Sequence, residues 1–350
     1  MKEIGSEFWI TEQCKDSKLQ FGEDIKLFLS GRTALDFIIR DIKLTRKFNS
    51  VYVPSYSCSS MLKPFIDNNI KLEFYNVVTK DDGRFTYEID FRKNVDAIIL
   101  LQYFGYYDEQ VGVISELFNK NDVIVIEDIT HSLFQNKPCT NYGTYIFGSL
   151  RKWTCFYSGA FAKKNNGKFL LKEPSKTNLL FTELRQNAFD MKFRYMNDKL
   201  DSKDEFLSSF RKAENLLETD YLNYCIDNIS LKRLLRLDVN YIKERRIKNA
   251  NLILNSITNN KIKPIFNNVK VGDCPLFVPI LVDASVRFKF KHYLIEKNIY
   301  CPIHWELSDI HNISDSAKVI YNEELSLICD QRYSEKDIKY LIDVINNFRV

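Results

Sequence analysis

The sequence predicts an α/β protein in which a large domain with a mainly parallel mixed sheet, sandwiched by helices, precedes a smaller C-terminal α/β domain. Three observations support this fold class. Short apolar strands alternate with helices in the first half, residues 175–216 are polar and helical, and short strands return after about residue 231. With 350 residues, 45% of them hydrophobic, the chain is long enough to bury the cores of about two domains.

The first half of the chain contains the alternating elements. A helix is expected to begin near Arg32, because capping residues precede apolar residues at helical spacing. A short strand follows at 51–54, where Pro54 ends it, and the stretch through Phe65 and Ile66 has a helical pattern. Strands separated by helices imply a parallel sheet that binds ligands beyond the carboxyl ends of its strands. The remaining predicted elements here are strands at 71–75, 97–101 and 123–126 and a helix at 111–119.

The second half has a different organisation. Residues 175–216 are interpreted as a helical linking segment, and one long helix is predicted from Leu231 to about Leu254. Short strands at 275–282 and helices at 288–297 and 336–348 then form the smaller domain. The predicted domains are an N-terminal arm at 1–20, a large domain at 21–230 and a small domain at 231–350.

Composition narrows the class of protein. Lys and Arg (50) nearly balance Asp and Glu (46), so the net charge of +4 gives no reason to expect a nucleic-acid or membrane partner. The eight cysteines are scattered without metal-binding spacing, so neither a metal site nor a disulfide framework is expected. The sequence shows no signal core and no apolar stretch of about 20 residues, which favours the cytoplasm, where free thiols are normal.

Two residues suggest the chemistry. Asp128 closes the apolar run that begins at Val123, and Lys152 follows Ser149 in the string Gly-Ser-Leu-Arg-Lys. Pyridoxal phosphate needs a carboxylate that keeps its ring nitrogen protonated, an amine that holds its aldehyde, and donors for its phosphate. The sequence supplies one candidate for each requirement.

Each of these residues also has an ordinary interpretation. Lys152 taken alone would be a solvent-exposed lysine, but its aromatic neighbourhood predicts a desolvated amine with a lowered pKa that attacks aldehydes. Asp128 would equally serve as a helix cap, and His131 as a buried structural histidine. Ser-x-x-Lys also occurs in acyl-serine enzymes, although the further motifs of those enzymes are missing here.

The segment from Ser30 to Ala34 has the composition of an anion site. Gly31 lets the backbone approach a ligand, and the amides of Arg32 and Thr33 lie where a helix begins and would point toward a phosphate. An ordinary helix cap explains the same residues, so both interpretations stay open at this point.

Taken together, these motifs resemble the DegT/StrS-type aminotransferases. These are pyridoxal-phosphate enzymes of fold type I that mostly aminate keto-sugars attached to nucleotides. The Asp-x-x-His and Ser-x-x-Lys elements are the most specific part of a likeness that covers almost the whole chain. The matching segments are Ile4 to Trp9, Ser30 to Leu35, Val53 to Cys58, Tyr103 to Gly105, Ile126 to Asp128 with His131, Ser149 to Trp153, Arg245 and Arg246 with Asn249, and Asp330 to Tyr333.

The resemblance implies a role for each matching residue. Lys152 would hold the cofactor as a Schiff base, Asp128 would pair with the ring nitrogen, and His131 would lie near the ring hydroxyl. Ser149 and the amides around Arg32 and Thr33 would bind the phosphate, with Gly31 at the start of the loop.

The chain also departs from the family pattern. Arg32 stands where the family has a small hydroxyl residue, and Cys58 stands where an aromatic residue often covers the ring, so Tyr56 is the substitute candidate. Asn228 is the candidate for a phosphate contact made across a subunit interface. The glycine pair that follows the lysine is reduced to Gly159 and Ala160.

The resemblance implies an aminotransferase that moves an amino group from an amino acid, probably glutamate in this family, to a keto-sugar that is typically nucleotide-linked. It also implies a homodimer with shared sites. A sugar dehydratase of the same fold is an alternative, but that branch typically replaces the lysine by histidine. A regulatory paralogue that binds the cofactor or another ligand without turnover is a second alternative.

His304 and Trp305 are candidates for the acceptor pocket or for loop packing, and Arg32, Arg236 and Arg332 for anion contacts or surface ion pairs.

Overall fold

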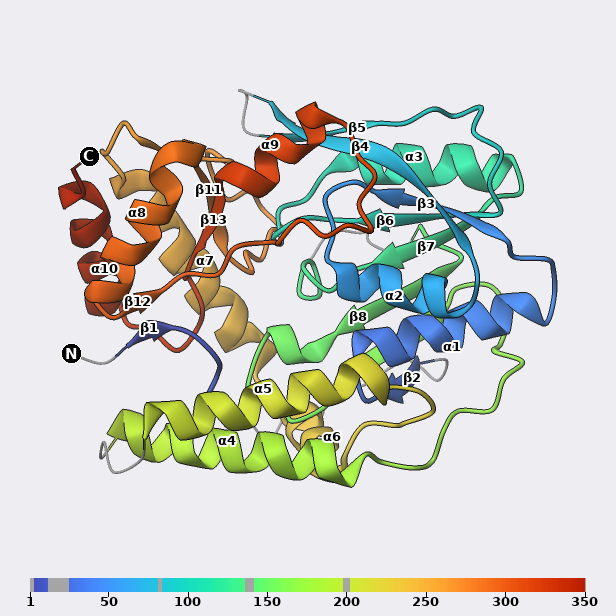
Figure 1. Ribbon diagram of the computed structural model, residues 1–350, viewed down its shortest axis with the longest axis horizontal. Helices are drawn as coiled ribbons and strands as arrows, with labels where there is room; N and C mark the ends of the chain where they lie inside the picture. The colour runs from blue at the N-terminus through green and yellow to red at the C-terminus, as the bar shows by residue number, and fades with distance from the viewer. Residues whose placement is uncertain (1–2, 12–24, 81–83, 136–141, 198–201, 350) are drawn as a thin grey trace.

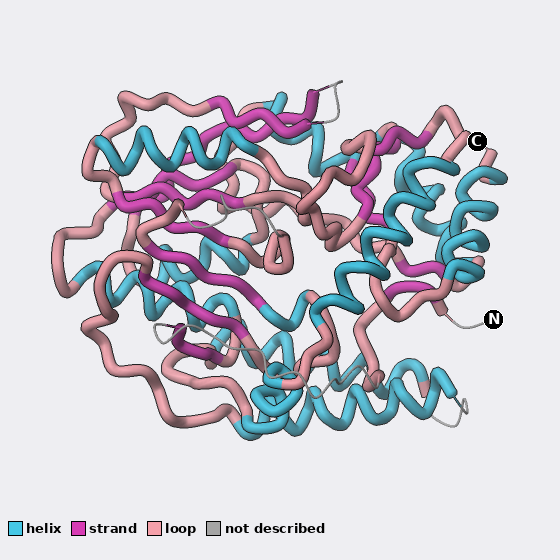
Figure 2. The backbone as a smooth tube through the Cα atoms, turned by 180° about the vertical axis from the view of Figure 1, so that it is seen from behind, coloured by secondary structure: helices cyan, strands magenta, loops and turns pink. Residues whose placement is uncertain are grey.

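The computed structural model describes residues 3–11, 25–80, 84–135, 142–197 and 202–349. Its centre is an eight-stranded sheet with the order β2-β9-β8-β7-β6-β3-β4-β5 (Figures 1 and 2). The pairs that join β4, β3, β6, β7 and β8 are parallel, and the remaining pairs toward both edges are antiparallel. The predicted mainly parallel mixed sheet is therefore confirmed. Its strands are β2 (Ile25–Phe28), β3 (Ser50–Pro54), β4 (Lys71–Lys80), β5 (Arg84–Glu88), β6 (Ala97–Leu101), β7 (Ile124–Asp128), β8 (Tyr145–Ser149) and β9 (Ala160–Lys164).

Helices cover both faces of this sheet, as the buried strands require. Alternate residues of a strand point to opposite faces, so Ile99 packs beneath α1 (Gly31–Lys43) and α2 (Ser59–Asp67). Its neighbour Ile98 packs with α3 (Glu109–Lys120) on the other face. The helices and strands predicted for the first half are thus present, with boundaries that differ by a few residues.

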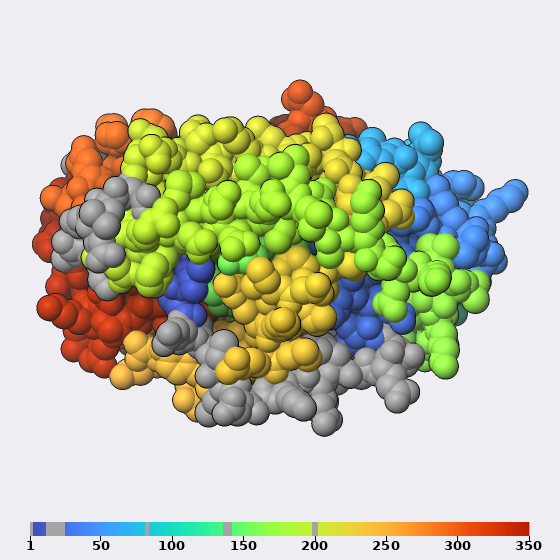
Figure 3. Space-filling view, turned by 90° about the horizontal axis from the view of Figure 1, so that it is seen from below, coloured from blue at the N-terminus to red at the C-terminus, as the bar shows by residue number. Residues whose placement is uncertain are grey.

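A helical hairpin occupies the predicted linking segment. It consists of α4 (Leu179–Asn197) and α5 (Lys203–Thr219), which lie side by side along the lower edge of Figure 1 and dominate the face shown in Figure 3. Buried Phe189, Phe206 and Phe210 join the two helices to Tyr157 of the large domain. The hairpin is therefore packed against the body of the protein.

The single long helix predicted from Leu231 is wrong. The structure has α6 (Asn228–Leu235) and then α7 (Val239–Ser256). The side chain of Asp238 accepts a hydrogen bond from the Tyr241 amide and so starts a new helix at this point. Leu234 and Leu237 lie on either side of the break and are buried in the same hydrophobic cluster. Their packing favours the interruption, which the helical periodicity of the sequence does not reveal.

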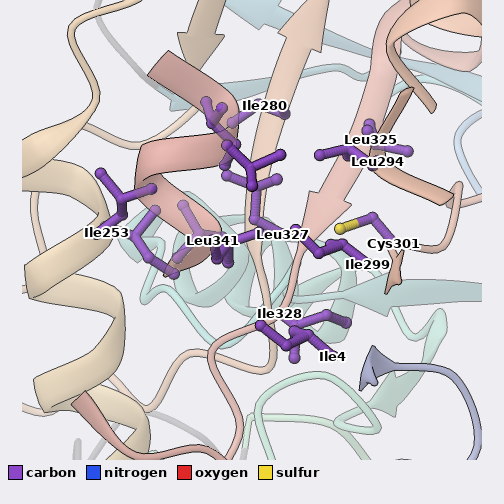
Figure 4. Close-up of a cluster of buried hydrophobic side chains, with 14 of the residues drawn as sticks. Ile4, Ile253, Ile280, Leu294, Ile299, Cys301, Leu325, Leu327, Ile328 and Leu341 are labelled. Atoms are coloured by element: carbon purple, nitrogen blue, oxygen red, sulfur yellow. The ribbon is translucent and has the colours of Figure 1, made fainter. Parts of the chain in front are cut away.

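The C-terminal part has its own small core. A three-stranded antiparallel sheet orders β10 (Ile262–Pro264), β11 (Val278–Val282) and β13 (Glu324–Leu327). Helix α10 (Glu335–Asn347) packs against α7, and Ile253, Leu327 and Leu341 meet in the cluster drawn in Figure 4. The other elements are α8 (Ala284–Glu296), β12 (Ile299–Tyr300) and α9 (Asp315–Glu323).

The described part of the N-terminal arm packs on this C-terminal part. Strand β1 (Ile4–Gly5) pairs in parallel with β12, and Ile4 belongs to the core of Figure 4. Residues 1–2 and 12–20 of the predicted arm lie outside the described residues. Among the described helices, none combines the length and apolar composition that a bilayer crossing requires.

Candidate active site

A cavity of about 670 Å³ lies at the carboxyl ends of β7 and β8. The start of α1 forms its floor with the ends of these strands, the α4–α5 hairpin forms one wall, and the loop after β12 forms another. A volume of this size accommodates a cofactor together with a small substrate. Seven of the ten predicted site residues line it, and these are Gly31, Arg32, Cys58, Asp128, His131, Ser149 and Lys152.

Asp128 is held rigidly at the end of β7. Its Oδ1 accepts a hydrogen bond from the Thr130 amide at 2.8 Å, and the Thr130 hydroxyl accepts one from the Ser149 amide at 3.0 Å. Burial raises the pKa of Asp128 to about 6, although the hydrogen bonds of Thr130 and the charge of Lys152 act in the opposite direction. A carboxyl group in this position is suited to bind a protonated ring nitrogen, because such a cation would compensate the buried charge.

Lys152 lies in the short helical turn η1 (Leu150–Lys152) that follows β8. It lines the same cavity as Asp128, and its charge acts on Asp128, His131 and His304. The expectation of a desolvated amine is wrong, because the side chain is exposed to the open cavity. The aromatic neighbour Trp153 turns the other way and buries completely, with its indole nitrogen donating to the Thr130 carbonyl.

His131 lies in the wall beside these two residues. Its Nδ1 accepts a hydrogen bond from the Phe104 amide at 3.3 Å, and burial lowers its pKa well below the usual value. The neutral ring therefore carries its proton on Nε2, which is the nitrogen available to donate to a ligand oxygen. Trp305, from the C-terminal domain, stacks on this ring with centroids 5.4 Å apart.

The start of α1 and the end of β8 form a cradle for an anion. A Cβ atom placed on Gly31 would lie 3.7 Å from the Cβ of Ser149, which shows how closely the two segments approach. The first amides of a helix have no partner within that helix. One terminal nitrogen of Arg32 pairs with Glu218 of α5 at 2.7 Å, while its Nη1 is buried without a hydrogen-bond partner. Such an unsatisfied donor is costly unless a ligand meets it.

Thr33 and Tyr56 do not reach the cavity. Thr33 is buried, its hydroxyl donates to the Tyr221 carbonyl at 2.7 Å, and its amide donates to Ser30. Tyr56 is completely buried behind the wall, and its hydroxyl donates to the carbonyl of His304. The structure therefore supports neither Thr33 as a phosphate ligand nor Tyr56 as a ring-covering residue.

Cys58 and Asn228 occupy different places. Cys58 lines the cavity as the residue before α2, where its thiol lies 3.1 Å from Ser60 Oγ. Asn228 is exposed at the start of α6 and does not line the cavity of its own chain. Its predicted contact across a subunit interface stays a prediction.

The sequence did not reveal the ionic wall contributed by the helical hairpin. Glu214 of α5 pairs with Arg185 of α4 at 3.1 Å and with Arg151 of η1. Although desolvation acts in the other direction, Arg151, Arg185 and Lys152 lower the pKa of Glu214 to about 2. Polar residues on a polar helix gave no signal that they face a cavity.

Arg332, a predicted candidate for an anion contact, already uses its donors within the protein. It forms an ion pair with Asp330 at 2.7 Å, and its Nη1 donates to the carbonyls of Ser6 and Glu7. Both side chains of the pair are almost completely buried. Arg332 therefore fastens the N-terminal arm to the C-terminal domain.

The sequence matches no protein-family model and no curated protein. Solved structures nevertheless match it along nearly the whole chain. The aminotransferase PseC of Helicobacter pylori, involved in pseudoaminic acid biosynthesis, has 13% identity over 98% of both chains and a TM-score of 0.65. A DegT/DnrJ/EryC1/StrS aminotransferase from Brucella abortus has 15% identity over 92% of this chain and 84% of its own, with a TM-score of 0.62. NtdA from Bacillus subtilis, with bound pyridoxamine phosphate, has 13% identity over 92% and 72%, with a TM-score of 0.63.

These comparisons concern the fold. The chain has the α/β architecture of the pyridoxal-phosphate aminotransferases of fold type I, with a large mixed sheet and a smaller C-terminal sheet. The predicted fold class is confirmed.

Proposed function

We propose that this protein is a pyridoxal-phosphate-dependent aminotransferase that moves an amino group from glutamate to a nucleotide-linked keto-sugar. The observation that carries the proposal is the meeting of Asp128 and Lys152 on one cavity, with the Gly31–Ser149 cradle in its floor. The fold of the neighbouring aminotransferases adds support. None of the individual residues would suffice alone.

The residues present fit the cofactor. The phosphate would lie on the cradle between the start of α1 and Ser149, where the unsatisfied Nη1 of Arg32 lacks a partner. Asp128 would bind the ring nitrogen and keep it protonated, and Nε2 of His131 would donate to the ring hydroxyl. Bound in this way, pyridoxal phosphate supplies an aldehyde for amines and a protonated ring that takes up electrons.

Lys152 has two tasks in this proposal. Its amine would hold the cofactor covalently, and the same amine, when free, would take a proton from the α-carbon of the amino donor. Exposure of Lys152 to the cavity favours the second task, because the side chain has room to swing. Asp128 keeps its charge near the ring throughout.

The test uses purified protein loaded with pyridoxal phosphate. Addition of L-glutamate should remove the visible absorption band of the lysine-bound form and release 2-oxoglutarate. A regulatory paralogue would show the band and leave it unchanged, so an unchanged band contradicts the proposal. A panel of keto-sugar nucleotides, free keto-sugars and keto acids added to the aminated form then identifies the acceptor by return of the band.

We also propose a homodimer. Leu179 and Leu180 of α4 and Ile229 and Leu235 of α6 are exposed apolar residues, and both helices appear on the face shown in Figure 3. Asn228 precedes Ile229 directly, so a partner bound here would meet it. Light scattering of the wild type and of Ile229→Asp measures the mass. A wild-type monomer at micromolar concentration would contradict the dimer.

A further inference from the structure

A chain of three hydrogen-bonded side chains, which we call the histidine relay, links Glu324 through Ser326 to His304 in the cavity wall. The ring of His304 lines the cavity beside His131, with centroids 5.6 Å apart, and the charge of Lys152 acts on it. Its Nδ1 lies 2.8 Å from Ser326 Oγ, which lies 2.5 Å from Glu324 Oε1. Since Nδ1 is engaged, Nε2 is the ring nitrogen left to act in the cavity.

Glu324 is completely buried at the start of β13. Its Oε2 accepts the backbone amide of His304 at 2.6 Å, while Arg287 of α8 donates to the backbone carbonyl of Glu324 and not to its carboxyl group. Burial raises the pKa of Glu324 to about 8, against the hydrogen bonds of Ser326 and His304 and the charge of Arg287. The carboxyl group is therefore largely protonated at neutral pH.

The proton of Glu324 sets the direction of every bond in the relay. When Glu324 is protonated, its carboxyl group donates to Ser326 Oγ, the Ser326 hydroxyl donates to Nδ1 of His304, and the ring carries its proton on Nε2. When Glu324 is a carboxylate, the Ser326 hydroxyl donates to Oε1 of Glu324 instead. When Nε2 loses its proton, the Ser326 proton moves to Nδ1 of His304 and the Glu324 proton moves to Ser326 Oγ. Glu324 is then a carboxylate. The buried acid is thus connected to the cavity without being exposed to it.

We propose that His304 gives a proton to the carbonyl oxygen of the keto compound that accepts the amino group, and that Ser326 and Glu324 replace it. When an amine nitrogen replaces a ketone oxygen, the nitrogen loses two protons and the oxygen leaves as water with two protons gained. The oxygen receives one proton from Nε2 of His304 and one from the nitrogen. The second proton released by the nitrogen returns along the relay to Glu324, so that no proton is gained or lost overall. The inference rests on the proposed function, in which the ketone carbon binds near Lys152.

The test measures the two half-reactions separately. In the reaction with L-glutamate, the visible band is lost before any ketone is released, so this rate does not depend on a proton for a ketone oxygen. The reaction of the pyridoxamine-phosphate-loaded protein with 2-oxoglutarate begins with a ketone and does need that proton. His304→Phe keeps an aromatic ring among Phe277 and Trp305 but has no proton to give. We expect it to slow the 2-oxoglutarate reaction about 100-fold, and Ser326→Ala to slow it about tenfold, with the rate of band loss nearly unchanged.

The chain offers a matched control for these variants. Ser308 Oγ lies 2.9 Å from Nδ1 of His311, a buried histidine in the same part of the protein that does not line the cavity. Ser308→Ala removes an equivalent Ser–His hydrogen bond, and both half-reactions should keep their rates. Equal slowing of the two half-reactions by His304→Phe, or no slowing, overturns the role of His304.

The pH profile separates proton supply from packing. The wild-type rate with 2-oxoglutarate should fall as the pH rises through about 8, since Glu324 then loses its proton. Ser326→Ala should lose this dependence. The other ionisable groups that act on the relay are Arg287 and Tyr56 near Glu324, and Lys152 and His131 near His304.

If Ser326→Ala does not fold, the solvent isotope effect on the wild-type rate with 2-oxoglutarate tests the relay instead. The 2-oxoglutarate reaction should be slower in D₂O, with a curved dependence on the deuterium fraction because several protons move together. The absence of an isotope effect overturns the relay. A wild type that forms no lysine-bound band, or keeps the band with L-glutamate, contradicts the proposed function and the relay with it, whereas normal wild-type conversion with unaffected variants overturns the relay alone.

Discussion

The Thr130 amide donates a hydrogen bond to Asp128 Oδ1 at 2.8 Å, so the segment that follows β7 holds the carboxyl group in place. This contact lets one oxygen stay satisfied by the protein while the other serves a ligand. It also means that a neutral substitute of the same shape can keep the acceptor bond. Asp128→Asn therefore removes the negative charge and can keep the hydrogen bond from the Thr130 amide.

We expect Asp128→Asn to lower turnover by about 100-fold or more, because a charge placed at a reacting ring typically contributes that much. The measurement is the rate at which L-glutamate removes the visible band. Asp41→Asn is the control, since Asp41 is a buried aspartate that accepts hydrogen bonds from Tyr145 and the Leu170 amide far from the described cavity lining. Equal loss in both variants would argue for a general structural effect.

The same substitution should stabilise the cofactor-free protein above pH 6. The pKa of Asp128 is raised from 3.8 to about 6, so the folded state binds this proton more tightly than the unfolded state. Its contribution to stability is complete below about pH 3.8 and is lost as the pH rises through about 6, up to about 3 kcal/mol. Denaturant unfolding at pH 4 and pH 8 should show a gain of Asp128→Asn relative to wild type that is small at pH 4 and largest at pH 8. Asp41→Asn should instead lose stability relative to wild type, with a loss no smaller at pH 8 than at pH 4, because hydrogen bonds from Lys164 and Tyr145 outweigh burial and lower the pKa of Asp41.

Lys152→Ala should abolish the covalent attachment of the cofactor. Borohydride reduction of the wild type loaded with pyridoxal phosphate should fix the cofactor on the peptide that contains Lys152, as read by mass spectrometry. Lys291 lines the same cavity from α8 and provides the matched control, so Lys291→Ala should keep the adduct. An adduct that persists in Lys152→Ala at another lysine would remove the central assignment.

Arg32→Ala should weaken binding of pyridoxal phosphate to the cofactor-free protein by about tenfold or more, because a charge-assisted hydrogen bond is lost. Titration followed by tryptophan fluorescence gives the dissociation constant directly. Arg40→Ala, on the same helix with an ion pair to Asp36 at 2.8 Å, controls for loss of an α1 arginine. Unchanged affinity in Arg32→Ala would show that Arg32 serves only its ion pair with Glu218.

The sequence was sufficient to predict most of the fold and the centre of the site. Apolar strands such as β6 and β7 are buried along their whole length, so their composition alone identifies them. Asp128 and Lys152 follow neighbouring strands of the sheet, where Asp128 pairs with Phe147 of β8, and the topology of parallel sheets brings such residues to one edge.

The errors have a common physical origin in contacts between distant segments. The motif predicts that the Thr33 amide binds the phosphate, but this amide donates to Ser30 Oγ, and the Thr33 hydroxyl donates to the carbonyl of Tyr221, which is distant in the sequence. Tyr56 was assigned to the ring for a similar reason, and the C-terminal loop buries it instead and supplies Trp305. Neither contact leaves a local pattern in the sequence.

The ion pair between Asp330 and Arg332 provides a last prediction about stability. Both side chains are nearly completely buried, so Asp330→Asn leaves a guanidinium without its partner and should cost about 3–5 kcal/mol of unfolding free energy. Asp330→Asn combined with Arg332→Met should recover part of this loss, since it removes both charges. Glu335, which pairs with Lys248 and Lys339 on the surface, is the control, and Glu335→Gln should leave the free energy of unfolding almost unchanged. Urea unfolding of the three variants and the wild type measures these differences, and a cost for Asp330→Asn no greater than for Glu335→Gln would show that the arm is not fastened through this pair.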